Sequence, residues 1–273
     1  MIITGRVIID GVDVKSTYGA YVVDGGLVDV PCIPSMKSPD INDWYEHNGI
    51  EADLESPRCE SAGYDVVFRM NGTLEQLESF MSFLRSSRHH SFEFQDIQRT
   101  VRLRLVSAHA SGISVGLFKI TLVLSDDAPL KNLHYNEINA SSKTTGLLLD
   151  GKDLCSYFLL LNGSVDDLFP EMKLKENKLH ESDYTNGEIH SEGVATYERD
   201  DISFTAIMRC KSINSFWKLR DNLAIDLFKP GERTISYKGR TMRAYYKDCR
   251  SVSFSYYSTI WWTFVLTFGY IGE

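Results

Sequence analysis

Histidines and carboxylates are the side chains of this sequence that could do chemistry, and their spacing argues against it. His89 and His90 are adjacent, so on a strand or a helix they would point apart, whereas zinc-binding histidines are usually three to five positions apart. We expect an exposed loop after a helix at this pair, and no metal site.

Two Asp-Gly-x-Asp segments, residues 10–13 and 150–153, each place two carboxylates close together. A calcium-binding loop needs further oxygen ligands at alternating positions, and neither segment supplies them. Each segment follows a short apolar run, and Asp-Gly is favoured in tight turns. We therefore expect a β-turn between two strands in both places.

The sequence gives no reason to expect a catalytic centre. We expect no nucleophile elbow, no phosphate-binding loop and no His-Glu-x-x-His metal motif. The protein is predicted not to be an enzyme and to need no cofactor and no metal. An enzyme whose site is built from residues far apart in the sequence is a third possibility, which activity in a hydrolase screen would reveal.

Composition describes the chain that must position these residues. It has 273 residues, of which 43% are hydrophobic and 12% aromatic; this is enough for a packed core and favours β-structure. The formal charge of -8 argues against general binding of duplex DNA, which needs a basic surface. No apolar run approaches the ~20 residues of a membrane-spanning helix, so no membrane partner is predicted. The five cysteines form no Cys-x-x-Cys pair, so we expect free thiols and synthesis in a reducing cytoplasm.

The sequence repeats itself at an offset of about 140 residues. Matching positions follow one another in the same order along both halves. They are Asp10-Gly11 and Asp150-Gly151, Tyr18 and Tyr157, Pro31 and Pro170, Asn48-Gly49 and Asn186-Gly187, Arg99-Thr100 and Arg240-Thr241, and the runs 120–124 and 262–266. We interpret the chain as two copies of one domain, residues 1–128 and 147–273, joined by a polar, turn-rich linker at 129–146.

Each copy is predicted to be mainly β with one helix. Residues 64–70 and 202–208 alternate between apolar and polar side chains, which is typical of a strand with one buried face. With the strands expected before and after, this gives two tandem α+β domains, each an antiparallel β-sandwich or small barrel. A long hairpin is expected around Asn48-Gly49.

A helix is predicted after each alternating strand. Thr73-x-x-Gln76 is a capping box, and Ser212 is the matching cap in the second copy. The apolar face of the first helix is expected to comprise Leu74, Leu77, Met81 and Leu84, and that of the second Ile213, Phe216, Leu223 and Leu227. Both faces are expected to pack into the core.

The negative charge gathers on the long polar stretch of each copy. Residues 31–60 hold seven acidic and two basic residues, and residues 170–200 hold eight acidic and four basic. Such a stretch is either a solvated loop or an acidic surface that repels nucleic-acid phosphate, and both interpretations stay open. The candidates for an acidic lumen or loop surface are Asp40, Asp43, Glu46, Glu51, Asp53, Glu181, Asp183 and Glu188.

The opening Ile-Ile-Asp-Gly-Val-Asp-Val-x-Ser-x-Tyr-Gly, residues 8–19, resembles the start of distal tail proteins of long-tailed phages. The later order also resembles theirs: a hairpin with Asn48-Gly49, the strand at 66–70, the helix at 74–84 and strands from Arg99 to Leu105. The resemblance is to the tail-tube-type domain of tube proteins, distal tail proteins and baseplate hubs. It covers each half of this chain.

This resemblance implies a structural phage or prophage tail protein, a distal tail or baseplate hub protein whose ring continues the DNA channel and connects the tube to the baseplate. It implies a homo-oligomer, either a trimer with a pseudo-sixfold ring or a hexamer, and tube, tape-measure and baseplate proteins as partners. DNA would only pass through. Localisation would be the bacterial cytoplasm during assembly and then the virion tail.

The resemblance implies that the long hairpin and the loops make ring-to-ring contacts. Two adjacent tryptophans on a strand face opposite sides, so that one is core and the other a candidate interface anchor. The candidate ring or partner contacts are Tyr45, Asn48, Gly49, Tyr184, Asn186, Gly187, Trp261 and Trp262. The alternative function is a non-enzymatic tandem β-sandwich that binds carbohydrate or a host surface through exposed aromatic side chains.

Overall fold

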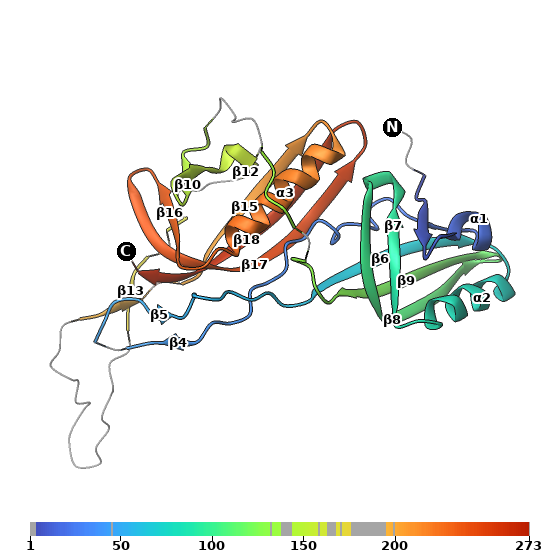
Figure 1. Cartoon of the computed structure of the whole chain (residues 1–273), viewed down its shortest axis with the longest axis horizontal. Helices are drawn as coiled ribbons and strands as arrows, with labels where there is room; N and C mark the ends of the chain where they lie inside the picture. The colour runs from blue at the N-terminus through green and yellow to red at the C-terminus, as the bar shows by residue number, and fades with distance from the viewer. Residues whose placement is uncertain are drawn as a thin grey trace, which may run out of the picture.

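The chain forms two antiparallel sheets, each packed against one long helix, side by side along the long axis of the molecule (Figure 1). The structure is a computed structural model. It describes residues 4–44, 46–131, 133–137, 144–157, 159–162, 168–169, 171–175, 195–198 and 200–272. The mainly β, α+β class is as predicted. None of the described helices is long and apolar enough to cross a membrane.

The first sheet has seven strands in the order β2-β1-β7-β8-β9-β6-β3. The elements of this half are β1 (Val7–Ile9), β2 (Val12–Asp13), α1 (Val14–Tyr18), β3 (Ala20–Val22), β4 (Ile41–Asn42), β5 (Glu51–Ala52), β6 (Ala62–Asn71), α2 (Leu74–Arg85), β7 (His89–Phe94), η1 (Gln95–Ile97), β8 (Arg99–Ser114) and β9 (Leu117–Asp126). Strands β4 and β5 pair only with each other.

The second sheet has the order β11-β10-β16-β17-β18-β15-β12. Its half comprises β10 (Leu147–Leu149), β11 (Lys152–Asp153), η2 (Leu154–Tyr157), β12 (Leu159–Asn162), β13 (Lys173–Leu174), β14 (Tyr197–Glu198), β15 (Ile202–Cys210), α3 (Ile213–Leu227), β16 (Arg233–Tyr237), β17 (Arg240–Tyr256) and β18 (Ile260–Gly272). Taken in chain order, the strands of the two sheets follow the same path.

The two sheets also share their pairing register. Tyr64 and Ile202 hold matching positions in β6 and β15, and they pair with Leu124 and Phe268. Leu124 and Phe268 therefore match each other, whereas the sequence comparison matched Leu124 with Leu266. That alignment is wrong by two residues, because the hairpin of β17 and β18 is longer than the hairpin of β8 and β9.

The two Asp-Gly segments are tight turns, as predicted. Positive φ angles occur at Asp10 (48°), Gly11 (81°), Asp150 (51°) and Gly151 (76°), the combination that a type I′ hairpin turn requires. The carboxylates bind the neighbouring strand: Asp10 accepts the N–H of Ser91, and Asp150 that of Thr234, both at 2.7 Å.

The alternating strands and the helix caps are confirmed. Tyr64, Val66, Phe68 and Met70 are buried on β6, as are Ile202, Phe204, Ala206 and Met208 on β15. The Thr73 hydroxyl accepts the N–H of Gln76 at 3.2 Å, and the Gln76 side chain accepts the N–H of Thr73 at 2.9 Å. Ser212 caps α3 in the matching position.

One residue of the expected helix face is exposed. Leu74 is 61% exposed because it is the first residue of α2, ahead of the turns that face the sheet. Phe80, three positions after Leu77, is fully buried instead. The buried face of α2 is therefore Leu77, Phe80, Met81 and Leu84.

Replacing the α2 cap should destabilise the first half. Thr73→Ala removes the acceptor for the Gln76 N–H, and we expect a loss of about 1 kcal/mol in the free energy of unfolding. Urea unfolding followed by circular dichroism measures it. Ser79→Ala, at an exposed position of the same helix, is the matched control. Equal stability of the two variants would contradict the role of the cap.

Candidate interaction surface

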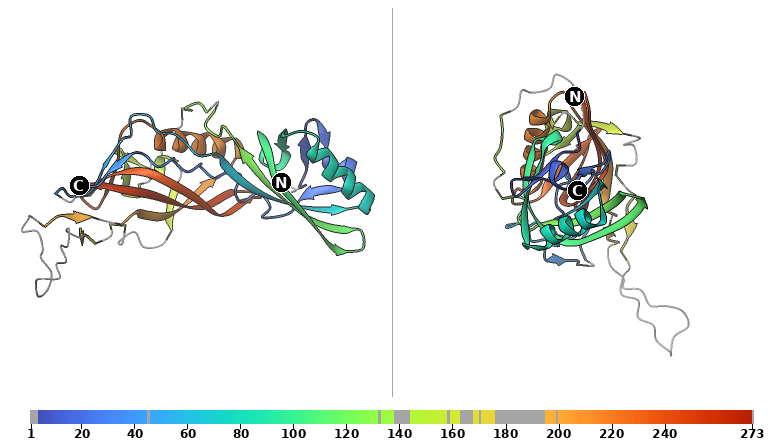
Figure 2. Two further views of the ribbon diagram at one scale, coloured as in Figure 1. Left: turned by 90° about the horizontal axis from the view of Figure 1, so that it is seen from below. Right: turned by 90° about the vertical axis from the view of Figure 1, so that its right-hand side faces the viewer.

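A segment of the first half crosses onto the second half. Residues 23–61, here called the arm, connect β3 to β6 and contain β4 and β5. In Figure 1 the arm leaves the first sheet and runs along the second, and Figure 2 shows the same course from below. The expected long hairpin is present, and it lies against the other half of its own chain.

Apolar side chains anchor the first part of the arm. Leu27, Val30 and Ile33 are each less than 5% exposed and belong to a core cluster that includes residues of both sheets. Full burial of a side chain of this size stabilises a fold by about 1.5–3 kcal/mol. Farther along, Leu54 packs against Tyr245 in a second apolar cluster. The arm is thus part of the core of the second half.

The arm also occupies an open edge of the second sheet. Strand β16 pairs with β17 only from Arg240 to Ala244. Beyond that point the arm lies beside β17: the Met36 N–H donates to the carbonyl of Lys247 at 2.8 Å, and the Cys32 thiol to that of Cys249 at 2.7 Å. Edge strands left uncovered tend to pair with other chains, and here the arm covers the edge.

A buried arginine fixes the arm from the other side. Arg220 on α3 is 2% exposed and donates to the carbonyls of Pro31 at 3.0 Å and Cys32 at 2.5 Å, while it pairs with Asp221 at 3.0 Å. A buried charge needs such partners. No pattern in the sequence singled out Arg220. The apolar residues Leu27, Val30 and Ile33 were the available sign in the sequence that the arm is buried.

Two thiols meet where the arm crosses β17. A hydrogen bond from Cys249 lowers the pKa of the Cys32 thiol, and burial raises the pKa of the Cys249 thiol well above its usual value. The structure describes all five cysteines, and none of them forms a disulfide.

The far end of the arm holds Asn48 and Gly49, two of the predicted contact residues. The Asn48 side chain accepts the N–H of Tyr197 at 2.8 Å, and the Gly49 N–H donates to the Tyr197 carbonyl at 3.0 Å. Lys175, 7% exposed, donates to the Gly49 carbonyl at 2.5 Å and pairs with Asp43. Asn48 and Gly49 therefore contact the second half of their own chain. Contacts with another copy stay a prediction.

The adjacent tryptophans face opposite sides of β18. Trp262 is fully buried and stacks on Phe264, so it cannot reach a partner. Trp261 is 38% exposed, with the Arg209 guanidinium 4.9 Å from its ring centroid. Trp261 thus remains the candidate anchor, and Arg209 covers a ring face on which a sugar would stack.

The acidic candidates of the first half lie in the exposed part of the arm. Asp40, Asp43, Glu46, Glu51 and Asp53 are all exposed. The remaining candidates, Tyr45, Glu181, Asp183, Tyr184, Asn186, Gly187 and Glu188, lie outside the described residues. Which surface faces a lumen is therefore still a prediction.

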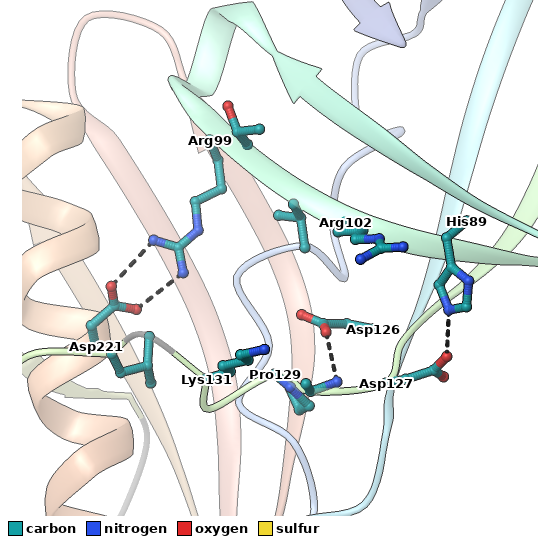
Figure 3. Close-up of a pocket in the computed structure, with 12 residues that line it drawn as sticks. His89, Arg99, Arg102, Asp126, Asp127, Pro129, Lys131 and Asp221 are labelled. Atoms are coloured by element: carbon teal, nitrogen blue, oxygen red, sulfur yellow. Dashed lines mark hydrogen bonds and ion pairs between the residues drawn. The ribbon is translucent and has the colours of Figure 1, made fainter. Parts of the chain in front are cut away.

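A cavity of about 530 Å³ opens where the halves meet, and Figure 3 shows its charged lining. Arg99 from β8 pairs with Asp221 on α3 at 3.2 Å. Nearby, hydrogen bonds from Arg104 and His89 hold the pKa of the Asp127 carboxyl well below its usual value. The pair of Arg99 and Asp221 joins the two halves across this cavity, so we interpret the cavity as part of the junction between the halves.

The predicted loop at His89 and His90 is wrong, because strand β7 starts at His89. The two rings point apart. His90 is 1% exposed, with Nδ1 2.6 Å from Asp10 Oδ2 and Nε2 2.9 Å from the Leu84 carbonyl. It thus links the end of α2 to the first turn. In the described part of the chain, no cluster of three or more His, Cys, Asp or Glu side chains could hold a metal ion.

Two catalytic patterns do occur in the sequence, contrary to expectation. Residues 112–116 read Gly-Ile-Ser-Val-Gly, and residues 146–152 contain Gly-x-x-x-x-Gly-Lys. A nucleophile elbow joins a strand to a helix, but Ser114 ends β8 at a hairpin. A phosphate-binding loop wraps an anion ahead of a helix, but residues 147–149 are strand β10. Neither segment has the required structure.

A methyl group at position 49 should loosen the arm. Gly49 has a φ of 74°, and a Cβ there would collide with the Ile271 carbonyl. Gly25 also has positive φ but has open space around it, so Gly25→Ala is the matched control for backbone strain. We expect Gly49→Ala to cost about 1–3 kcal/mol more than Gly25→Ala, measured by urea unfolding. Equal losses would mean that the tip is not packed as described.

No protein-family model matches the sequence, and no curated protein matches it. Among solved structures the chain is similar to one titled "Crystal Structure of SPP1 Dit (gp 19.1) Protein, a Paradigm of Hub Adsorption Apparatus in Gram-positive Infecting Phages". The match has 11% identity and a TM-score of 0.35, and it covers 96% of this chain and 97% of that chain. A TM-score this low carries no argument about the function of this chain.

Proposed function

We propose that the protein is a structural component of a phage or prophage tail, a distal tail or baseplate hub protein that forms a ring at the tail tip. In this proposal the chain is two copies of one domain, residues 1–128 and 147–273. It needs no catalysis and no cofactor. The ring would continue the DNA channel and connect the tube to the baseplate.

The observation that supports a ring is the path of the arm. The arm starts beside β6 of its own sheet, where the Val23 N–H donates to the Val67 carbonyl, and then leaves that sheet and lies along the edge of the next sheet in the chain. Two units of the same strand order are thus linked head to tail. A head-to-tail contact, repeated between chains, closes into a ring when the rotation allows it.

The count of units fits the stoichiometry that the sequence resemblance implies. Each chain supplies two sheets of the same strand order, so three chains would supply a pseudo-sixfold ring, and a hexamer would supply twice as many sheets. The exposed carboxylates of the arm, such as Asp40 and Asp53, would repel phosphate and let DNA pass without binding it. Tube, tape-measure and baseplate proteins are the proposed partners.

The purified protein should form a closed ring. We expect light scattering to give the mass of a trimer or a hexamer, and negative-stain images to show rings with a central hole. If the protein needs neighbouring tail proteins to assemble, adding them should produce the same rings. Monomers at all concentrations, with no ring after those proteins are added, would contradict the proposed function.

A further inference from the structure

The first sheet has an open edge. It lies at the position that matches the edge of the second sheet covered by the arm. Strand β7 pairs with β8 only from Arg99 to Arg104, just as β16 pairs with β17 only over its first residues. Past Leu105, no described strand pairs with β8 on the β7 side, although β9 continues on the other side as far as Ser114. The edge at residues 106–114 is the counterpart of the edge on which the arm lies.

The match between the two edges extends to a bulge. In β8 the register shift falls between Leu105 and Ser107, so Val106 is the bulged residue; in β17 it falls between Tyr246 and Asp248, at Lys247. The carbonyl of Lys247 is the group that accepts the Met36 N–H of the arm. The matching position, Val106, is 55% exposed, and Ile113 farther along the same edge is 49% exposed.

The second half carries the start of an arm of its own, with the same hydrogen bonds. The Lys37 N–H donates to the Arg58 carbonyl at 2.8 Å, and the Lys175 N–H to the Thr196 carbonyl at 2.9 Å. This equivalence makes Leu174 the counterpart of Met36. Met36 is packed against the second sheet, whereas Leu174 is 62% exposed and Met172 is 47% exposed.

We propose that residues 171–175 of one copy of this chain dock on the open edge of β8, residues 106–114, of a second copy. The contact repeats between chains what residues 33–37 and β17 do within one chain, where the Met36 N–H donates to the Lys247 carbonyl, and it places Leu174 beside Val106. It buries exposed apolar side chains of the two copies against each other and covers the start of the open edge of β8, which an isolated chain would leave available for unspecific pairing.

The open edge itself is uncharged, because residues 106–114 contain no Lys, Arg, Asp or Glu. The proposed contact is therefore made by backbone groups and by exposed apolar side chains, with Leu174 of one copy beside Val106 of the next.

The proposed contact rests on the proposed ring, so the experiment distinguishes a failure of the contact from a failure of the ring. The edge variant carries Val106→Asp and Ile113→Asp, and the arm variant carries Met172→Asp and Leu174→Asp; all four residues are exposed, so the fold should not depend on them. Leu74→Asp, at another exposed leucine, is the control. Circular dichroism checks the fold, and light scattering after gel filtration gives the mass.

We expect the wild type and Leu74→Asp to form the same oligomer, and each double variant alone to be monomeric. An equimolar mixture of the two double variants should form a 1:1 dimer and nothing larger, because one intact edge and one intact arm remain. A mixture that stays monomeric would overturn the contact. So would a wild type that is monomeric at every concentration.

Other outcomes separate the contact from the ring. Double variants that assemble like the wild type would overturn the contact and leave the ring proposal standing. If the wild type forms open chains of many copies and the double variants do not, the result would support the contact and contradict the closed ring. If a double variant does not fold, the single variants Val106→Cys and Leu174→Cys are mixed instead. An intermolecular disulfide between them on a non-reducing gel would support the contact. Cross-linking no greater than that seen when Leu74→Cys replaces one of the two variants would overturn it.

Discussion

The burial of the arm against the second sheet is the interaction on which the rest of this structure depends. Ile33 and its neighbours fill space in the core of the second half, and Arg220 holds the backbone carbonyls of Pro31 and Cys32 from within α3. With the arm in place Arg220 is 2% exposed, so the arm carbonyls supply the hydrogen bonds that a buried guanidinium needs and that water cannot supply there. The second half is therefore incomplete without a segment that the first half supplies.

This dependence makes the two ends of the chain different, because one half supplies an arm and the other half receives it. The arm joins sheet to sheet in one direction only, and the pair of Arg99 and Asp221 adds a charged contact across the same junction. A unit that completes its neighbour and needs completion itself is suited to repeated assembly. The proposed ring follows from that asymmetry, with no special chemistry required.

Local features could be predicted from the sequence, because they depend on residues that are close along the chain. The alternation in β6, the Thr73 capping box and the Asp10-Gly11 turn each have a period or a preferred turn type. The burial of His90 could not be predicted, since its partners Asp10 and Leu84 reach it from separate elements. The destination of the arm was equally out of reach, because Cys32 and Cys249 are 217 residues apart and no periodic pattern joins them. The contacts of Asn48 and Gly49 with Tyr197 of the same chain were not predicted either, and a contact of these residues with another copy stays a prediction.

The central claim is that an arm covers the open edge of a sheet both within a chain and between chains. Hydrogen exchange along β8 tests this claim most directly. Wild-type protein would be labelled in the monomeric and the assembled state, and the amides of residues 106–114 followed by mass spectrometry. We expect assembly to slow their exchange towards that of residues 247–251 of β17, which the arm contacts in every chain. Equally fast exchange at residues 106–114 in both states would contradict the claim.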